Sequence, residues 1–193
     1  MLRGWNNPMD DLPTLTTDRL TLNRFTLEDV PRVAELCGDW ETAKTTLHLP
    51  HPYTQDIGRA WIESHQDTIE RGVACPFAVR LTKGGELIGC VGLHPNTQHR
   101  RGEIGYWVGV PFWGQGYCTE AARAVIGFGF TTLDLNAITC GYFVGNHASQ
   151  RVMAKLGITH EGVRRQHVFR HDRYIDLAVG TLLRSQWEAG GGA

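Results

Sequence analysis

The sequence lacks a long apolar run, and no stretch approaches the roughly 20 residues that a membrane-spanning helix needs. The N-terminus also lacks the basic start and apolar core of a secretory signal. Charge of neither sign dominates, because 19 Lys and Arg stand against 20 Asp and Glu, for a net charge of −1. No global field therefore attracts nucleic acid, and we expect a cytoplasmic protein that binds neither nucleic acid nor a membrane.

Cysteine is scarce, and its pattern excludes two further classes of protein. The five cysteines are odd in number and form no C-x-x-C pair, which argues against a disulfide framework or a zinc site. His167 and His171 have an H-x-x-x-H spacing, but no cysteine pair accompanies them. We expect no metal cofactor.

What is present is the composition of an ordinary globular domain. The chain has 193 residues, of which 41% are hydrophobic and 20% charged. We expect a loose lead-in over residues 1–13, one domain over residues 14–187 and a glycine-rich flexible tail over residues 188–193. A basic cluster is interpreted either as a contact to an acidic substrate or to phosphates or, with more weight, as the solvated face of a hairpin. Its members are Arg164, Arg165, His167, Arg170, His171 and Arg173.

The most informative stretch is Glu103–Phe130, EIGYWVGVPFWGQGYCTEAARAVIGFGF. Its first eight residues have the β-branched and aromatic content of a strand, which Pro111 ends. Gly114 and Gly116 follow, and the apolar residues after Thr119 then recur at helical spacing. The pattern predicts a strand, a glycine-rich turn and a helix.

Such a turn is suited to binding phosphate, because the first amides of a helix lack internal partners and carry the positive end of its dipole. A tight turn that binds nothing is an equally good reading of the two glycines alone. A Walker loop is excluded, because Gln115 and Gly116 stand where Lys and Ser/Thr are needed. A dinucleotide fingerprint is disfavoured, because residue 119 is Thr instead of a third glycine. A pyrophosphate-bearing ligand with its own reactive group fits better.

Strands and helices alternate irregularly along the rest of the chain, which favours one mixed sheet with helices on its faces. Strands are expected at residues 15–24, 77–81, 87–93, 103–110, 137–144, 158–163 and 174–183. Helices are expected at residues 26–38, 40–49, 54–72, 119–130 and 146–157, with Asn146 as an N-cap and Gly157 as a left-handed stop.

Three stretches together resemble the GNAT acetyltransferase superfamily. Trp113–Cys118, WGQGYC, is similar to its coenzyme A loop, usually written Q/R-x-x-G-x-G/A. Asn146–Gly157 is similar to N-x-x-S-x-x-V-x-x-K-x-G, a signature of the branch that contains ribosomal-protein N-terminal (RimJ/RimL-type) acetyltransferases, and Leu15–Leu22 resembles that branch's first strand. The resemblance implies an α/β (α+β) GNAT fold. This is a single six- to seven-stranded mixed, mostly antiparallel sheet with helices on both faces and splayed central strands.

The resemblance also implies where acetyl-CoA binds. Backbone amides at the end of the strand, at Val108, Gly109 and Val110, are expected to meet the oxyanion. Asn146 is expected to hydrogen-bond the pantetheine arm, to cap its helix, or to do both. The pyrophosphate is assigned to Trp113, Gly114, Gln115, Gly116, Tyr117, Cys118 and Thr119.

In this family an amine attacks the thioester directly, so the protein must hold two reactants and manage two protons. Ser149 is expected to contact the cofactor and to act as the acid toward the leaving thiol, because Met153 stands where many GNAT enzymes have a tyrosine. Packing against the strand is its alternative role. Glu103 is the expected base, or else an exposed edge carboxylate, and a water chain could replace it. Val168 stands where ribosomal-protein enzymes have a glutamate.

The implied activity is transfer of an acetyl group from acetyl-CoA to a primary amine. An N-terminal α-amine is favoured, because its pKa of roughly 8 leaves far more neutral amine near pH 7 than lysine does. A small amine such as an antibiotic or a polyamine, and a non-catalytic acyl-CoA-binding module, are the alternatives. The oligomeric state, monomer or homodimer, is left open.

Overall fold

The computed structural model describes residues 12–192, so most of the expected lead-in (residues 1–11) and Ala193 lie outside the described part. Eight strands form one sheet in the order β1-β2-β3-β4-β5-β6-β8-β7. All neighbours are antiparallel except β5 and β6, which are parallel. The strands are β1 (Leu15–Thr16), β2 (Leu20–Asn23), β3 (Cys75–Leu81), β4 (Leu87–Asn96), β5 (Arg101–Val108), β6 (Ala137–Phe143), β7 (Thr159–Arg170) and β8 (Arg173–Leu183).

Seven α-helices and three short 3₁₀ turns connect these strands within residues 12–192. The helices are α1 (Val30–Gly38), α2 (Trp40–Ala43), α3 (Gln55–Glu63), α4 (His65–Glu70), α5 (Tyr117–Thr131), α6 (His147–Lys155) and α7 (Arg184–Ala189). The 3₁₀ turns are η1 (Leu27–Asp29), η2 (Thr97–His99) and η3 (Val110–Phe112).

The predicted fold class is confirmed, and the sheet has eight strands instead of six or seven. The difference arises because the expected strand at residues 15–24 is a small hairpin, in which Leu15 pairs with Leu22. Thr17 closes its turn: the Thr17 amide donates to the Leu20 carbonyl at 2.9 Å, and the Leu20 amide donates to the Thr17 hydroxyl at 3.0 Å.

Two helix predictions differ from the structure, and so does the start of the expected tail. The helix expected at residues 40–49 ends at Ala43, where the Thr45 and Thr46 hydroxyls donate back to main-chain carbonyls, a competition that disfavours further helix. The helix expected at residues 54–72 is interrupted at Ser64. The helix α7 covers the start of the expected tail.

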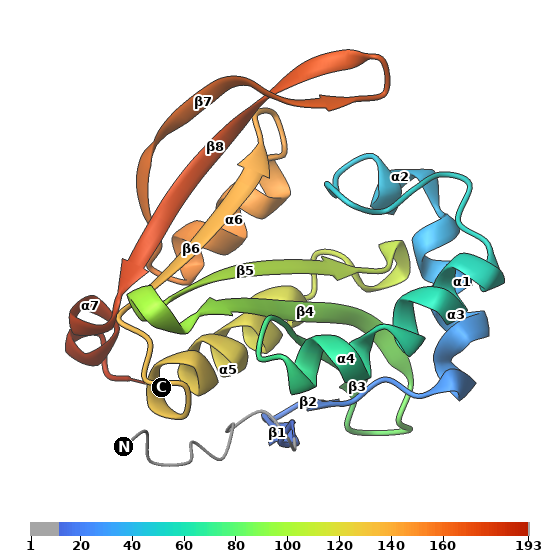
Figure 1. Ribbon diagram of the computed structural model, residues 1–193, viewed down its shortest axis with the longest axis horizontal. Coiled ribbons are helices and arrows are strands. Elements are labelled where there is room, and N and C mark those ends of the chain that lie inside the picture. Colours follow the sequence, from blue (N-terminus) through green and yellow to red (C-terminus); the bar gives the residue numbers. More distant parts are fainter. Residues whose placement is uncertain (1–11, 193) are drawn as a thin grey trace.

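Helices cover both faces of the sheet (Figure 1). On one face, α5 buries Ala121, Val125 and Phe128 in the larger core cluster with Phe77 and Leu93. On the other face, α1 and α3 close a second cluster around Val33 and Ile62 with Cys90 from the sheet. Side chains alternate along a strand, so consecutive β5 residues belong to different faces.

The parallel pair β5–β6 is short and then opens. Its register holds only from Arg101–Ala137 to Glu103–Thr139, after which the two strands diverge (Figure 1). The long β7–β8 hairpin continues beyond the sheet as an arm that reaches toward α2 (Figure 1). The opening of the sheet therefore begins just past Glu103.

Candidate active site

The loop between β5 and α5 presents a row of unpaired main-chain amides. Gly114 and Gly116 have φ of +74° and +83°, a left-handed conformation that glycine adopts without steric cost. The first internal helix bond is donated by Glu120 to the Gly116 carbonyl, at 3.1 Å. Within residues 12–192, the amides of residues 114–119 donate to no other protein group. This is the geometry of an anion site at a helix N-terminus.

Side chains within the loop fix its shape. The indole N–H of Trp113 donates to the Val108 carbonyl at 2.6 Å. The Gln115 side-chain amide donates to the Pro111 carbonyl at 3.1 Å. The polar groups of both side chains are therefore used in hydrogen bonds within this segment, and the main-chain amides remain to face a ligand.

The β1–β2 hairpin contacts the loop and the first turn of α5 and stabilises their positions. The guanidinium of Arg19 donates to the Gln115 carbonyl at 3.1 Å, pairs with the Glu120 carboxylate at 2.6 Å and lies over the Tyr117 ring. The Thr17 hydroxyl also donates to Glu120, at 2.5 Å. Burial acts to raise the pKa of Glu120, but the hydrogen bonds from Thr17 and Arg19 outweigh burial and hold it below its usual value. The first turn of α5 is therefore anchored to β1 and β2.

The three amides expected at the oxyanion are not equivalent. The Gly109 amide donates to the Ile88 carbonyl at 2.9 Å and so is not available to a ligand. Because an antiparallel ladder alternates, the Val108 amide points away from β4 and toward the opened side of β5. Val110 donates to no backbone carbonyl in the described part of the chain. Of the three amides expected to meet the oxyanion, only those of Val108 and Val110 are therefore available.

Ser149 lies across the opening from β5 and has a partner that the sequence analysis missed. Its hydroxyl is 2.8 Å from the hydroxyl of Tyr106. Its amide donates to the Asn146 side-chain oxygen at 3.1 Å, which confirms Asn146 as the N-cap of α6. Burial raises the pKa of Tyr106 far above its usual value, so the phenol remains a proton donor. With Tyr106 donating, the Ser149 proton is free to point into the cleft.

Cys118 and Cys140 lie on the two sides of the same opening and both line the cleft. Burial raises the pKa of each thiol to about 12. A protonated thiol is a poor nucleophile, so neither cysteine has the properties of a reactive one.

These groups surround one cleft of about 1070 Å³ that passes through the opening between β5 and β6. Its loop side comprises residues 106, 108, 112–114, 116–119, 146 and 149. Its helix side is lined by residues 41–61, by α4 and by the other face of β4 and β5, where Glu103 lies exposed at the end of the β5–β6 pairing. The predicted site residues other than Gly109, Val110 and Gln115 line this cleft.

One arginine of the β7–β8 arm makes hydrogen bonds to the end of α2 and to the segment between α2 and α3 on the helix side of the cleft. The guanidinium of Arg170 donates to the main-chain carbonyls of Ala43 at 3.2 Å, Leu47 at 2.6 Å and Leu49. The Trp40 ring lies edge-on to His51 at 5.1 Å and to His171 at 4.8 Å between ring centroids. The interpretation of the basic cluster as a solvated face is therefore wrong for Arg170, which shapes the α2–α3 loop.

Val168, at the place of the expected glutamate, is 8% exposed and pairs with Ile175. It is a packing residue and supplies no proton acceptor.

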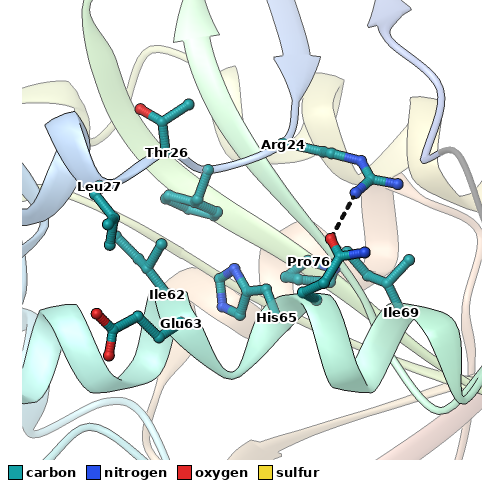
Figure 2. Close-up of a pocket in the computed structure, with 10 residues that line it drawn as sticks. Arg24, Thr26, Leu27, Ile62, Glu63, His65, Ile69 and Pro76 are labelled. Carbon is teal, nitrogen blue, oxygen red and sulfur yellow. Dashed lines mark hydrogen bonds between the residues drawn. The ribbon is translucent and has the colours of Figure 1, made fainter.

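A smaller cavity of about 300 Å³ adjoins the helix side (Figure 2). His65 and Pro76 line both cavities, and Figure 2 shows the His65 ring between Ile62 and Pro76. Burial lowers the pKa of His65 to about 4, and neither ring nitrogen has a hydrogen-bond partner among the described residues. His65 is therefore a neutral packing residue at neutral pH.

Residues 12–192 contain no cluster of three or more His, Cys, Asp or Glu side chains able to hold a metal ion. They also contain no helix that is both long and apolar enough to cross a membrane.

Comparisons with known proteins agree with this geometry. The profile of the family described as "Acetyltransferase (GNAT) domain" matches residues 19–159. YoaA of Bacillus subtilis (strain 168), described as an uncharacterized N-acetyltransferase, is 33% identical over 174 residues, which cover 89% of this chain and 97% of that protein. The ribosomal-protein-serine acetyltransferase of Escherichia coli (strain K12) is 30% identical over 144 residues, covering 74% and 79%. The solved structure of RimL, a ribosomal L7/L12 alpha-N-protein acetyltransferase in complex with coenzyme A, superposes with a TM-score of 0.82 at 19% identity, covering 90% and 99%.

Proposed function

The chain belongs to the GNAT acetyltransferase family, and we propose that the primary amine it acetylates from acetyl-CoA is the N-terminal α-amine of a protein or peptide. The observation that carries the proposal is the row of unpaired amides at residues 114–119, which opens into a cleft continuous with the helix side. One ligand can bind its diphosphate at the loop while its reactive end reaches the second substrate.

The loop side supplies binding and the leaving-group proton. The amides from Gly114 to Thr119 hold the pyrophosphate near the dipole of α5, whereas the expected Trp113 amide donates to the Val110 carbonyl at 3.1 Å and is not available. The amides of Val108 and Val110 stabilise the oxyanion as the amine attacks the thioester carbon. Ser149, with Tyr106 donating to its oxygen, gives its proton to the departing thiolate, and Asn146 binds the pantetheine arm while capping α6.

Two considerations favour an α-amine over a lysine or a polyamine. An α-amine, with a pKa of roughly 8, needs less help to lose its proton than an amine that titrates near 10.4. The only carboxylate on the cleft wall beside the opening is Glu103 among the described residues, and it is exposed, so this side lacks a buried strong base. A relative named a ribosomal-protein-serine acetyltransferase also supports a protein acceptor.

The test is intact-mass analysis after incubation with acetyl-CoA. The panel contains peptides with free and with blocked N-termini, each carrying an internal lysine, together with a polyamine and an aminoglycoside. One added acetyl group on free N-termini alone is expected. Acetylation of small amines alone would favour the small-molecule alternative, and coenzyme A binding with no acetylated amine would favour a non-catalytic binding module.

A further inference from the structure

The helix-side face of β4 and β5 contains a bare patch of backbone. Gly92 and Gly105 lie directly opposite each other in the β4–β5 register, and both line the cleft. A Cβ added to Gly105 would meet no atom within 4 Å, and one added to Gly92 would meet only the His94 Nε2, at 3.6 Å. We call Gly92 and Gly105 the glycine floor. It is a place where a ligand can lie directly on main chain.

The glycine floor is closed at one end and polar at the other. On one side the next pair in register is Cys90 and Trp107, which pack toward α1 and α3 in the second core cluster. On the other side the next pair is His94 and Glu103, and both of these side chains are exposed. Directly opposed residues on one face of an antiparallel pair have Cβ atoms about 5 Å apart, so the two side chains leave the sheet at neighbouring points. The His94 Nε2 lies 3.6 Å from the place of a Cβ on Gly92, at the edge of the glycine floor.

This polar pair lies at the start of the opening between β5 and β6. Glu103 is the last β5 residue that pairs with β6, so His94 and Glu103 stand at the start of the opening. Tyr106 belongs to the opposite face of β5, where its hydroxyl meets Ser149. The strand therefore separates a proton-donating pair on the loop side from a pair with proton-accepting groups on the helix side.

We propose that the glycine floor is the seat of the acceptor amine and that His94, held by Glu103 across the strand, accepts the proton that the amine loses. This inference rests on the proposed function and adds His94 to Ser149 as a second residue that moves a proton in the reaction. An imidazole readily accepts and returns a proton near neutral pH. The ligand class is a primary amine at the end of a narrow, extended chain, because the floor leaves room only where a Cβ is absent.

The step balances without a further reactant. The nitrogen lone pair of the neutral amine forms the C–N bond to the thioester carbon, and the C–S bond breaks as the tetrahedral adduct collapses. The nitrogen gives one proton to the His94 imidazole, and the departing thiolate takes one proton from Ser149. The imidazolium then returns its proton through water, which restores Ser149.

Other titratable groups share the helix side with His94, and the pH test must separate them. They are Glu103 from β5, Cys90 from β4, His65 from α4, Tyr53 from the loop before α3, and Glu41, Lys44 and His48 from α2 and the loop that follows it. His65 is buried against the rings of Phe25 and Trp61, and neither of its ring nitrogens has a hydrogen-bond partner among the described residues, whereas the other histidine, His48, comes from the α2–α3 loop.

The first experiment uses Gly105→Ala to test whether the acceptor amine binds on the glycine floor. Because the added methyl meets no protein atom and the backbone at Gly105 is not left-handed, the fold is undisturbed. The KM for the amine should rise at least tenfold, while the affinity for coenzyme A measured by calorimetry stays unchanged. Gly127→Ala, in α5 with only Trp187 nearby at 3.9 Å, is the matched control. An unchanged KM in Gly105→Ala would show that the amine does not bind on the glycine floor.

The second experiment tests His94 with His94→Gln, and with His99→Gln, on η2 outside the lining of the cleft, as the control. The kcat of His94→Gln should fall at least tenfold, and the acid limb of its kcat profile should disappear, with coenzyme A affinity unchanged. A wild-type profile and kcat in His94→Gln would overturn the role of His94. If the wild-type protein acetylates no amine at all, the proposed function itself fails, which is a separate outcome.

Discussion

On the loop side of the cleft the groups that face the diphosphate are main-chain amides of one continuous segment, whereas the helix side combines the glycine floor of β4 and β5 with side chains from distant parts of the chain. On the loop side, the left-handed glycines at residues 114 and 116 and the start of α5 set the amides within one continuous segment. On the helix side, Arg170 fixes the α2–α3 loop from more than 120 residues away. The comparison suggests that coenzyme binding is robust to side-chain change, and that acceptor binding is not.

The largest expected effect concerns the helix side and its dependence on pH. The pKa of His65 is lowered from 6.5 to about 4 in the folded protein, so the unfolded chain binds more protons between these values. Stability contributed by neutral His65 is therefore complete above pH 6.5 and is lost as the pH falls toward 4, by roughly 3 kcal/mol at 1.36 kcal/mol per unit of pKa.

Urea unfolding between pH 7 and pH 4 measures this loss. His65→Phe, which fills the same space without titrating, should remove that part of the acid dependence, while the exposed His160→Gln should leave it in place. Equal acid dependence in wild type and His65→Phe would contradict the assignment. The pKa of Glu120 is lowered from 4.5, so its own contribution is lost at still lower pH and is distinguishable.

The next effect concerns the loop side. Gly116→Ala forces a side chain into a left-handed conformation at a cost of roughly 1–2 kcal/mol and places a methyl group beside the amides. The affinity for coenzyme A should fall by about 30-fold in calorimetry. Gly85→Ala carries a comparable strain, at φ of +70°, in the turn between β3 and β4, and it should lose stability but not affinity. Equal losses of affinity in both variants would contradict a specific role for the loop.

A smaller effect is expected from the arm. Arg170→Gln removes the donors to the carbonyls of Ala43, Leu47 and Leu49, so the α2–α3 loop loses its position. The KM for the amine should rise about tenfold, in line with the loss of charged hydrogen bonds of about 1.5 kcal/mol, while coenzyme A affinity is unchanged. Arg173→Gln, on the same arm, is the control. A parallel loss of coenzyme A affinity would break the distinction between the two sides.

The smallest effect is expected from Tyr106→Phe. Loss of one neutral hydrogen bond to Ser149 should lower kcat by about fivefold, within the range of roughly 1 kcal/mol for such a bond. In the Ser149→Ala background the same substitution should have no effect, because its partner is gone. Additive effects in this double-mutant cycle, measured by kcat, would show that the two hydroxyls act separately.

The two sides also differ in how far the sequence predicts them. The strand, the glycine turn, the Asn146 cap and the left-handed Gly157 all rest on spacings within a few residues, and all are present in the structure. The split of the first strand was missed because the turn from Thr17 to Leu20 contains no glycine or proline to mark it.

Contacts between distant residues could not be predicted in the same way. Tyr106 carries the signal of a strand residue packed on one face, and nothing local places its hydroxyl beside Ser149, 43 residues later. Arg170 is one member of a basic run whose other members give no reason to single it out. His94 becomes a candidate only when the register places it opposite Glu103. Their roles become visible only once the register of the paired strands and the path of the β7–β8 arm are known.

The central claim is that the main-chain amides between Trp113 and Thr119 hold the diphosphate of coenzyme A. Amide hydrogen exchange of the full chain, with and without coenzyme A, tests it most directly, with pantetheine as the ligand that lacks the diphosphate. We predict that coenzyme A slows exchange at residues 114–119 and that pantetheine does not. Unchanged exchange at these amides under saturating coenzyme A would contradict the account.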